Sequence, residues 1–273
     1  MQIRANAYAK INWALNITGR RPNGYHELDM LMQSIDLCDE MTFADADALT
    51  LTVDGAPADD SNLVLKAARA LNRLTGQSRG AAMTLQKRIP ARAGLGGGSA
   101  DCALTLKILN DLWGLGLSDP ELLALGATLG ADLPFCLTGG LARVTGIGEH
   151  IAPCPASPRI PLVLVTPGGG LSTAEVFTLW DSGNFPLVAL DTPALAEAVQ
   201  RRDLSAVQRL CKNALTAPAI RLMPEIGSLL RAFDAPAVLM TGSGSTVVAA
   251  FEDEARARKA SEKIPGALLT HTR

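Results

Sequence analysis

The amino-acid sequence predicts an α+β fold in two domains. Strand-like and helical segments alternate, but without the strict strand–helix period of a doubly wound sheet. The chain has 273 residues, more than most single cores contain and enough for two. Four prolines between residues 153 and 161 interrupt regular structure and indicate a boundary. We therefore expect an N-terminal domain at residues 1–155 and a C-terminal domain at residues 156–273.

The N-terminal half is expected to combine short strands with amphipathic or buried helices. Alternating or continuous apolar runs predict strands at residues 3–17, 30–35, 41–43, 49–53, 82–89 and 141–144. Apolar positions at helical spacing, with cap residues before them, predict helices at residues 63–74, 102–113 and 118–129.

The C-terminal half continues the mixture with shorter elements. The same criteria predict strands at residues 162–165, 238–241 and 246–251. Helices are predicted at residues 173–179, 193–201, 204–211 and 225–233, with a last helix that begins near Asp253.

Composition excludes several classes of function. The net charge is -2, so the chain has no basic excess for a nucleic-acid backbone or an anionic membrane. Its first residues lack the pattern of a secretory leader, so we expect none, and the sequence contains no apolar run of roughly 18 residues that could span a membrane. Its five cysteines are scattered and form no Cys-x-x-Cys pair. This pattern favours free thiols in a reducing cytoplasm over disulfides or a zinc site. We expect a cytoplasmic protein with a small-molecule partner, and a monomer or weak homodimer.

Residues 94–99, Gly-Leu-Gly-Gly-Gly-Ser, form a glycine-rich loop between a predicted strand and a predicted helix. Glycine lets the backbone approach a ligand closely, and the amides at a helix N-terminus bind anions. The loop lacks the lysine of a P-loop and the last glycine of a dinucleotide fingerprint. By itself the loop predicts a phosphate site without specifying the nucleotide.

The stretch from Pro90 to Ser99 resembles the phosphate loop of the GHMP kinases, such as the galactose, homoserine and mevalonate kinases. Four further motifs occur in the same order as in one branch of that superfamily. They are Ala9-Lys-Ile-Asn12, Gly19-Arg-Arg-Pro-Asn-Gly-Tyr-His26, Leu129-Gly-Ala-Asp-Leu-Pro-Phe135 and Thr241-Gly-Ser-Gly-Ser245. Together the motifs are similar to those of the 4-diphosphocytidyl-2-C-methyl-D-erythritol kinase family of the non-mevalonate isoprenoid pathway.

The resemblance implies a two-domain GHMP kinase fold. Its N-terminal domain would be like domain 2 of ribosomal protein S5, and its C-terminal domain ferredoxin-like. The implied reaction is ATP-dependent phosphorylation, with Mg²⁺, of the 2-hydroxyl of a cytidine diphosphate-linked sugar alcohol. ATP contacts are implied for Pro90, Ala93, Gly94, Leu95, Gly96, Gly97, Gly98 and Ser99.

The resemblance also implies two catalytic residues, Asp132 as the base and Lys10 as its partner. A cation beside the carboxylate would keep it ionised and orient the attacking hydroxyl. The residue pattern alone leaves Asp132 equally well explained as a helix or turn cap. For Lys10 the pattern favours a strand residue whose ammonium reaches solvent.

Substrate contacts are implied for Asn12, Tyr25, His26, Thr173, Phe177, Gly242 and Ser243. Tyr25 and Phe177 would stack on cytosine, and His26 would hydrogen-bond its edge. Asn12 would face the reacting end. Without the resemblance, Phe177 also fits a helical core and residues 242–245 fit a tight hairpin.

The loop departs from the family pattern at two positions. Arg92 replaces a glycine, and Ala100 replaces a second serine. The serine that reaches magnesium in mevalonate-type relatives aligns with Gly98, so we assign no protein metal ligand. Three alternatives remain: a kinase for another alcohol, a dinucleotide-dependent oxidoreductase and a non-catalytic nucleotide-binding module.

Overall fold

The computed structural model describes residues 2–183, 185 and 189–273. The chain forms two compact units that interleave along the sequence. The first unit contains Met1–Ala9, Leu37–Ile89 and Gly96–Thr138, and the second contains Lys10–Asp36, Pro90–Leu95 and Gly139–Arg273. Two long strands, β1 (Gln2–Arg20) and β2 (His26–Ala46), continue from one unit into the other. No single cut reproduces these units, so the division into residues 1–155 and 156–273 stays a prediction.

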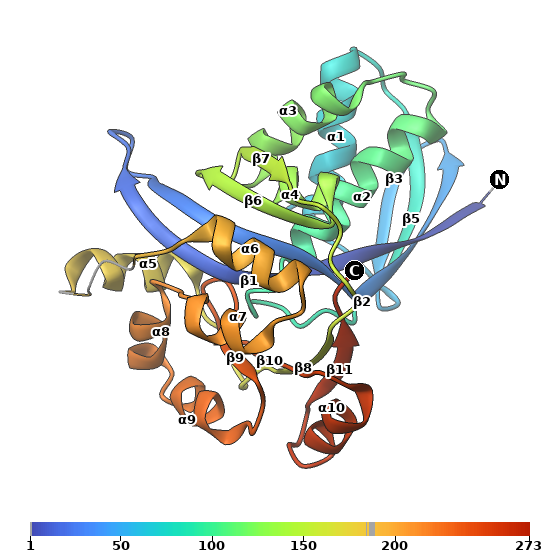
Figure 1. Ribbon diagram of the computed structural model, residues 1–273. Coiled ribbons are helices and arrows are strands. Elements are labelled where there is room, and N and C mark those ends of the chain that lie inside the picture. Colours follow the sequence, from blue (N-terminus) through green and yellow to red (C-terminus); the bar gives the residue numbers. More distant parts are fainter. Residues whose placement is uncertain (1, 184, 186–188) are drawn as a thin grey trace. The chain divides into compact units, whose positions relative to one another are not determined.

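The first unit packs four helices against a small sheet (Figure 1). Strand β5 (Gly80–Gln86) pairs in parallel with β3 (Leu49–Val53) and antiparallel with residues 40–46 of β2. A short strand, β4 (Ala56–Pro57), completes a hairpin with β3. Buried and exposed residues alternate along β5, because one face of the sheet is covered and the other is not.

The four helices of the first unit supply most of its core. They are α1 (Leu63–Thr75), α2 (Gly97–Leu112), α3 (Asp119–Leu129) and α4 (Leu133–Thr138). Asn62 caps α1 by accepting the Val64 amide proton, and Ser118 and Glu121 form a capping box on α3. These capping signals in the sequence therefore predicted both helix starts correctly.

The second unit contains a four-stranded antiparallel sheet in the order β11-β8-β10-β9. Its strands are β8 (Pro161–Val165), β9 (Ala237–Met240), β10 (Val247–Ala250) and β11 (Leu268–His271). All residues of β8 and β10 are buried, as expected for the two central strands of a covered sheet. In the same unit, residues 28–33 of β2 pair with β6 (Leu141–Gly146), which pairs with β7 (His150–Pro153).

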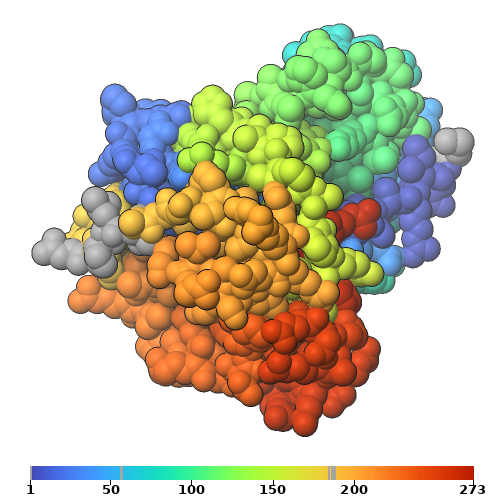
Figure 2. All heavy atoms as spheres, viewed as in Figure 1, coloured from blue at the N-terminus to red at the C-terminus, as the bar shows by residue number. Residues whose placement is uncertain are grey.

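Among the described residues, six helices of the second unit follow β8 in the chain. They are α5 (Thr173–Ser182), α6 (Thr192–Gln200), α7 (Leu204–Leu210), α8 (Thr216–Leu222), α9 (Glu225–Ala232) and α10 (Glu254–Ser261). Their side chains form much of the continuous orange-to-red surface of this unit in Figure 2. No helix in the described part of the chain is long and apolar enough to cross a membrane.

Most expected elements are present, but six features differ. The two strands expected at residues 30–35 and 41–43 are parts of one continuous strand, β2. Helices α4 and α8 and strands β4, β7 and β11 were not expected. Each of these has only two to seven residues, too few for a periodic pattern, and β11 depends on pairing with the distant β8.

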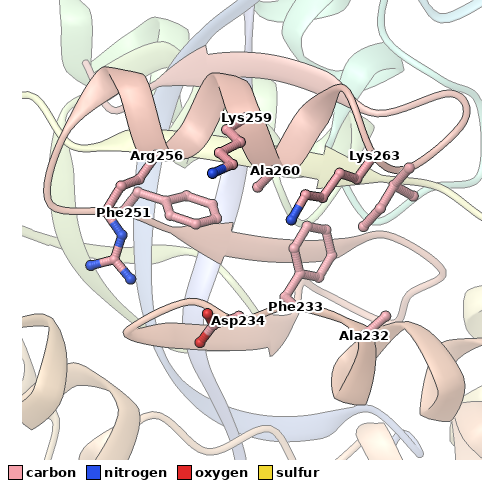
Figure 3. A pocket seen from close by; sticks show the side chains of 9 residues that line it. Ala232, Phe233, Asp234, Phe251, Arg256, Lys259, Ala260 and Lys263 are labelled. Carbon is pink, nitrogen blue, oxygen red and sulfur yellow. The ribbon is translucent and has the colours of Figure 1, made fainter.

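A surface hollow of about 280 Å³ lies beside α10 in the second unit (Figure 3). Arg256, Lys259 and Lys263 extend over it, above the rings of Phe233 and Phe251. Long cationic side chains commonly cover apolar surface in this way. None of the residues expected to form a site lines this hollow.

Candidate active site

Lys10 and Asn12 form a buried polar pair on β1. Their spacing of two residues places both side chains on the same face of the strand. Lys10 is 4% exposed and Asn12 is 1% exposed, and the Lys10 Nζ donates to Asn12 Oδ1 at 2.7 Å. The Asn12 amide donates to Thr241 Oγ1 at 2.8 Å. The ammonium therefore does not extend to solvent, contrary to the interpretation that the strand pattern alone favoured.

Residues 93–95, in the first half of the expected phosphate loop (residues 90–99), lie against this pair within the second unit. The Lys10 amide donates to the Leu95 carbonyl at 3.0 Å, and the Thr246 amide donates to the Ala93 carbonyl at 3.2 Å. Gly94 has a φ of 76°, and a Cβ there would lie 2.4 Å from the Thr241 carbonyl oxygen. Glycine is thus required at residue 94 by both conformation and space. Ala93 and Leu95 are buried, so any ligand contact from them would come from the backbone.

The connection between β9 and β10 completes this group. A Cβ on Gly242 would lie 3.0 Å from the Gly94 carbonyl oxygen and 3.3 Å from Lys10 Nζ. Asn213 Nδ2 donates to the Gly242 carbonyl at 2.8 Å, and the hydroxyls of Thr173 and Ser243 lie 2.8 Å apart. The hairpin interpretation is confirmed, and a substrate contact from Gly242 or Ser243 stays a prediction. The connection joins two antiparallel strands and lies beside Lys10.

A second cluster surrounds His26. Its ring stacks on Phe177 with centroids 4.7 Å apart and planes at 23°, and the Trp180 ring meets it edge-on at 5.7 Å. His26 Nε2 hydrogen-bonds to Asp181 Oδ1 at 2.7 Å. Tyr25 is 60% exposed. Phe177 is half-buried and packs on His26, so it is not a simple core residue.

Trp180 and Asp181 were not expected as site residues. They follow Phe177 by three and four positions on α5, the spacing that places side chains on one helix face. That spacing is the signal in the sequence that could have identified them. Arg20, on β1, also reaches Asp181, with Nη2 at 3.4 Å from Oδ2.

The second half of the phosphate loop opens α2 in the first unit. Gly96 is the N-cap with a φ of 70°, and no side chain caps the helix. The amides of the first helical turn have no partner within the helix, so they can bind an anion. A Cβ on Gly97 would lie 2.9 Å from Ile89 Cγ2. Ala100, which replaces the family's second serine, is buried in the apolar core.

A buried charge cluster supports this loop. Lys87 Nζ hydrogen-bonds to Asp39 and, at 2.7 Å, to Asp101 Oδ2. Asp39 also accepts the amide protons of Arg88 and Ile89, just before the loop. Burial raises the pKa of Asp101 to about 7, against the opposing attraction of Lys87, and the nearby Asp39 raises it further. The sequence pattern did not identify this cluster, although Asp101 is a carboxylate on the buried side of a largely apolar helix.

Asp132 lies directly before α4 in the first unit. Its carbonyl accepts the Cys136 amide proton at 3.0 Å, so its backbone begins the helix, and the residue is partly exposed. Asp132 and Lys10 belong to different units. Their pairing therefore stays a prediction.

Two family models match this chain. The N-terminal domain of the GHMP kinases matches residues 62–140, and the C-terminal GHMP kinase domain matches residues 195–268. A 4-diphosphocytidyl-2-C-methyl-D-erythritol kinase from Geobacillus sp. (strain WCH70) is 38% identical over 97% of this chain and 94% of that protein. The kinase of that name from Paramagnetospirillum magneticum is 41% identical over 96% of this chain and 93% of its own length. The chain belongs to the 4-diphosphocytidyl-2-C-methyl-D-erythritol kinase family.

Solved structures agree with this assignment to the diphosphocytidyl-methylerythritol kinase family. A crystal structure of 4-(cytidine 5′-diphospho)-2C-methyl-D-erythritol kinase matches with a TM-score of 0.85 and 34% identity, over 99% of each chain. A homoserine kinase from Cytophaga hutchinsonii matches with a TM-score of 0.74 at 18% identity, which establishes a shared fold only. The expected two-domain GHMP kinase fold and family membership are therefore confirmed.

Proposed function

We propose that this protein transfers the γ-phosphoryl group of ATP to the 2-hydroxyl of 4-diphosphocytidyl-2-C-methyl-D-erythritol. The observation that carries the proposal is the buried Lys10 ammonium beside Gly94 of the phosphate loop and the Gly242 turn. Relatives of that name, which match nearly the whole chain, support the choice of alcohol.

Phosphoryl transfer depends mainly on positioning and on stabilising the charge of the transferring group. Lys10 is held by Asn12, so its ammonium is oriented before substrate binds. In this proposal Lys10 offsets negative charge on the phosphoryl oxygens, and the loop amides hold the other phosphates. Asp132 orients the attacking hydroxyl or accepts its proton.

The substrate's base would bind at the His26 cluster. A centroid separation of 4.7 Å is typical of offset rings, so His26 covers only part of the Phe177 face. The remaining face can stack on a pyrimidine, and the exposed Tyr25 ring can cover the other side. Thr173 and Ser243, whose hydroxyls pair at 2.8 Å, are proposed to contact the sugar or diphosphate.

ATP and Mg²⁺ are the proposed cofactors. Among the described residues, no group of three or more His, Cys, Asp or Glu side chains could hold a metal ion. We propose that Mg²⁺ would be held by the nucleotide's own phosphates and by water, the oxygen ligands that this ion commonly takes with nucleotides. When bound, the ion neutralises charge on the β- and γ-phosphate oxygens.

The proposal is tested with purified protein, ATP, Mg²⁺ and the diphosphocytidyl alcohol, with ADP formation as the measurement. We expect ADP with this alcohol and no more than background with homoserine or mevalonate. The Asp132→Asn variant should lose at least about a hundredfold in kcat while it still binds ATP. Asp111→Asn, which changes an exposed carboxylate on α2, is the matched control and should keep the wild-type rate. A folded wild-type protein that makes no ADP with the diphosphocytidyl alcohol would refute the proposal.

A further inference from the structure

We propose that Asp181, through His26, makes the base pocket prefer an amino-bearing pyrimidine such as cytosine over uracil. This inference rests on the proposed function, since it assumes that a pyrimidine base binds beside His26. Asp181 acts here as a positioning residue, because its carboxylate contacts the histidine and is not assigned a contact with the base.

The hydrogen bond between His26 and Asp181 has a defined direction. A carboxylate oxygen only accepts hydrogen bonds, so at 2.7 Å the Nε2 of His26 must carry the proton that it shares with Asp181 Oδ1. In a neutral imidazole the other nitrogen then has a lone pair. His26 Nδ1 is thereby an acceptor.

Neighbouring side chains fix the orientation of the His26 ring and of the Asp181 carboxylate. The His26 side chain is 11% exposed, with Phe177 stacked on its face and Trp180 against it edge-on. These contacts restrict rotation of the ring. On the other side of Asp181, Arg20 Nη2 lies 3.4 Å from Oδ2, so a donor faces each carboxylate oxygen. Asp181 is therefore held as an acceptor, and His26 as the Nε2–H tautomer.

Cytosine and uracil differ in the hydrogen-bonding groups that they present to His26. Cytosine has an exocyclic amine, a donor, at the position where uracil has a carbonyl, an acceptor. An Nδ1 acceptor in the plane of a stacked base accepts a hydrogen bond from the amine of cytosine. With uracil, the same acceptor faces a carbonyl oxygen, and no hydrogen bond forms between two acceptors. Leaving such polar groups unpaired in a partly desolvated site costs about tenfold or more in affinity.

The test measures binding of cytidine 5′-diphosphate and uridine 5′-diphosphate by calorimetry. We expect wild-type protein to bind the cytidine nucleotide at least about tenfold more tightly. Asp181→Asn and Asp181→Ala should each reduce this ratio by about tenfold, because His26 can then take either tautomer. Asp181→Glu keeps the carboxylate and should restore most of the preference. Glu197→Gln, which removes an exposed carboxylate paired with Arg201 on α6, should leave the ratio unchanged.

A spectroscopic measurement tests the same inference without binding or turnover. The chain has only three histidines, so ¹⁵N NMR can assign the ring nitrogens of His26. We expect the Nε2–H tautomer in the wild type and a mixture, or the Nδ1–H form, in Asp181→Asn. A wild-type ring protonated at Nδ1 would overturn the inference even if the binding ratio favours cytidine.

The outcomes separate this inference from the proposed function. If wild-type protein prefers the cytidine nucleotide and Asp181→Ala keeps that preference, the role of Asp181 is wrong and the kinase proposal stands. If folded wild-type protein binds neither nucleotide, this inference is wrong. If it also forms no ADP from the diphosphocytidyl alcohol, the proposed function is wrong too.

Discussion

Lys10 is a cation in an almost fully buried position. Removing an ammonium from water is costly unless it is hydrogen-bonded, and Asn12 supplies one such bond at 2.7 Å. A strand that needed only stability would accommodate an apolar residue at this position more easily. The cost is therefore better explained by a charge that is needed for binding or catalysis.

Replacing Lys10 by Met separates that charge from packing, because the side chain keeps a similar shape. We expect kcat to fall by about a hundredfold or more, as when one stabilising donor is removed from a transition state. Stability should fall by about 1–3 kcal/mol, because the buried Asn12 Oδ1 loses its donor. Steady-state kinetics and thermal unfolding provide the two measurements. Lys66→Met, at an exposed position of α1, is the control and should change neither kcat nor stability. A fully active Lys10→Met enzyme would contradict the role assigned to Lys10.

At the scale of elements, the phosphate loop has glycines with two different requirements. Gly94 has a positive φ and no room for a Cβ beside the Thr241 carbonyl. Gly98 lies in the first turn of α2, and a Cβ there would meet only Leu63 Cδ1, at an ordinary 3.5 Å. The fold therefore requires glycine at residue 94. At residue 98 the fold would accept a Cβ, so the glycine there leaves open space at the start of α2.

Alanine at these two positions should therefore have opposite effects on stability. Gly94→Ala should lower the free energy of unfolding by about 1–3 kcal/mol through backbone strain and the clash. Gly98→Ala should leave stability unchanged or raise it by up to about 1 kcal/mol, since alanine favours helix. If the loop amides bind phosphate, Gly98→Ala should still raise the KM for ATP. Urea unfolding and ATP titration give both results, and an unchanged KM would argue against phosphate binding at Gly98.

The charge cluster behind the loop predicts a pH dependence. Burial raises the pKa of Asp101 from 3.8 to about 7, so between these values the folded state binds more protons than the unfolded state. The contribution of this group to stability is thus fully present below pH 3.8 and is lost as the pH rises through about 7. Asp101→Asn cannot ionise, and Lys87 keeps its bond to Asp39 in that variant.

We therefore expect the stability of Asp101→Asn, relative to the wild type, to rise with pH between about 4 and 7 and then to level off. Urea unfolding at a series of pH values measures this difference. Asp119→Asn, an exposed carboxylate on α3, serves as the comparison. A constant difference between Asp101→Asn and the wild type across this range would contradict the raised pKa.

At the scale of the whole molecule, the residues proposed for phosphoryl transfer come from both units. The phosphate loop itself divides between Leu95 and Gly96, and the two proposed catalytic residues belong to different units. A ligand that binds only the folded protein stabilises it by mass action. Nucleotide binding should therefore be visible in the unfolding of the whole chain.

ATP with Mg²⁺ should raise the melting temperature in a concentration-dependent way, whereas NAD⁺ should not. At a hundred times its dissociation constant, ATP would add about 2.7 kcal/mol to the free energy of unfolding. Differential scanning calorimetry measures the shift. A larger shift with NAD⁺ than with ATP would favour the dinucleotide-dependent alternative and contradict the kinase proposal.

The sequence by itself determined the α+β class, most strands and helices and the family, and it predicted a phosphate loop at residues 94–99. These follow from local signals: apolar periodicity, cap residues such as Asn62 and Ser118, and motifs whose residues are near one another in the chain. Of the residues proposed from the sequence, Lys10, Gly94 and Gly242 are indeed close together. Two of the hydrogen bonds in this group come from Thr241, which is part of the Thr241–Ser245 motif, and from Asn213, which no local pattern identified.

Only the tertiary structure decided the interleaved units, the continuous β2, the Lys87 cluster and the contacts of His26. Each depends on residues far apart in sequence, such as Asp39 with Lys87 and His26 with Asp181. The physical reason is that hydrogen bonds and ring contacts depend on distances in space, whereas periodicity reports only which face of an element is buried. A strand pattern suggested that Lys10 reaches solvent, and only long-range packing of the glycine loop and the β9–β10 connection could bury it.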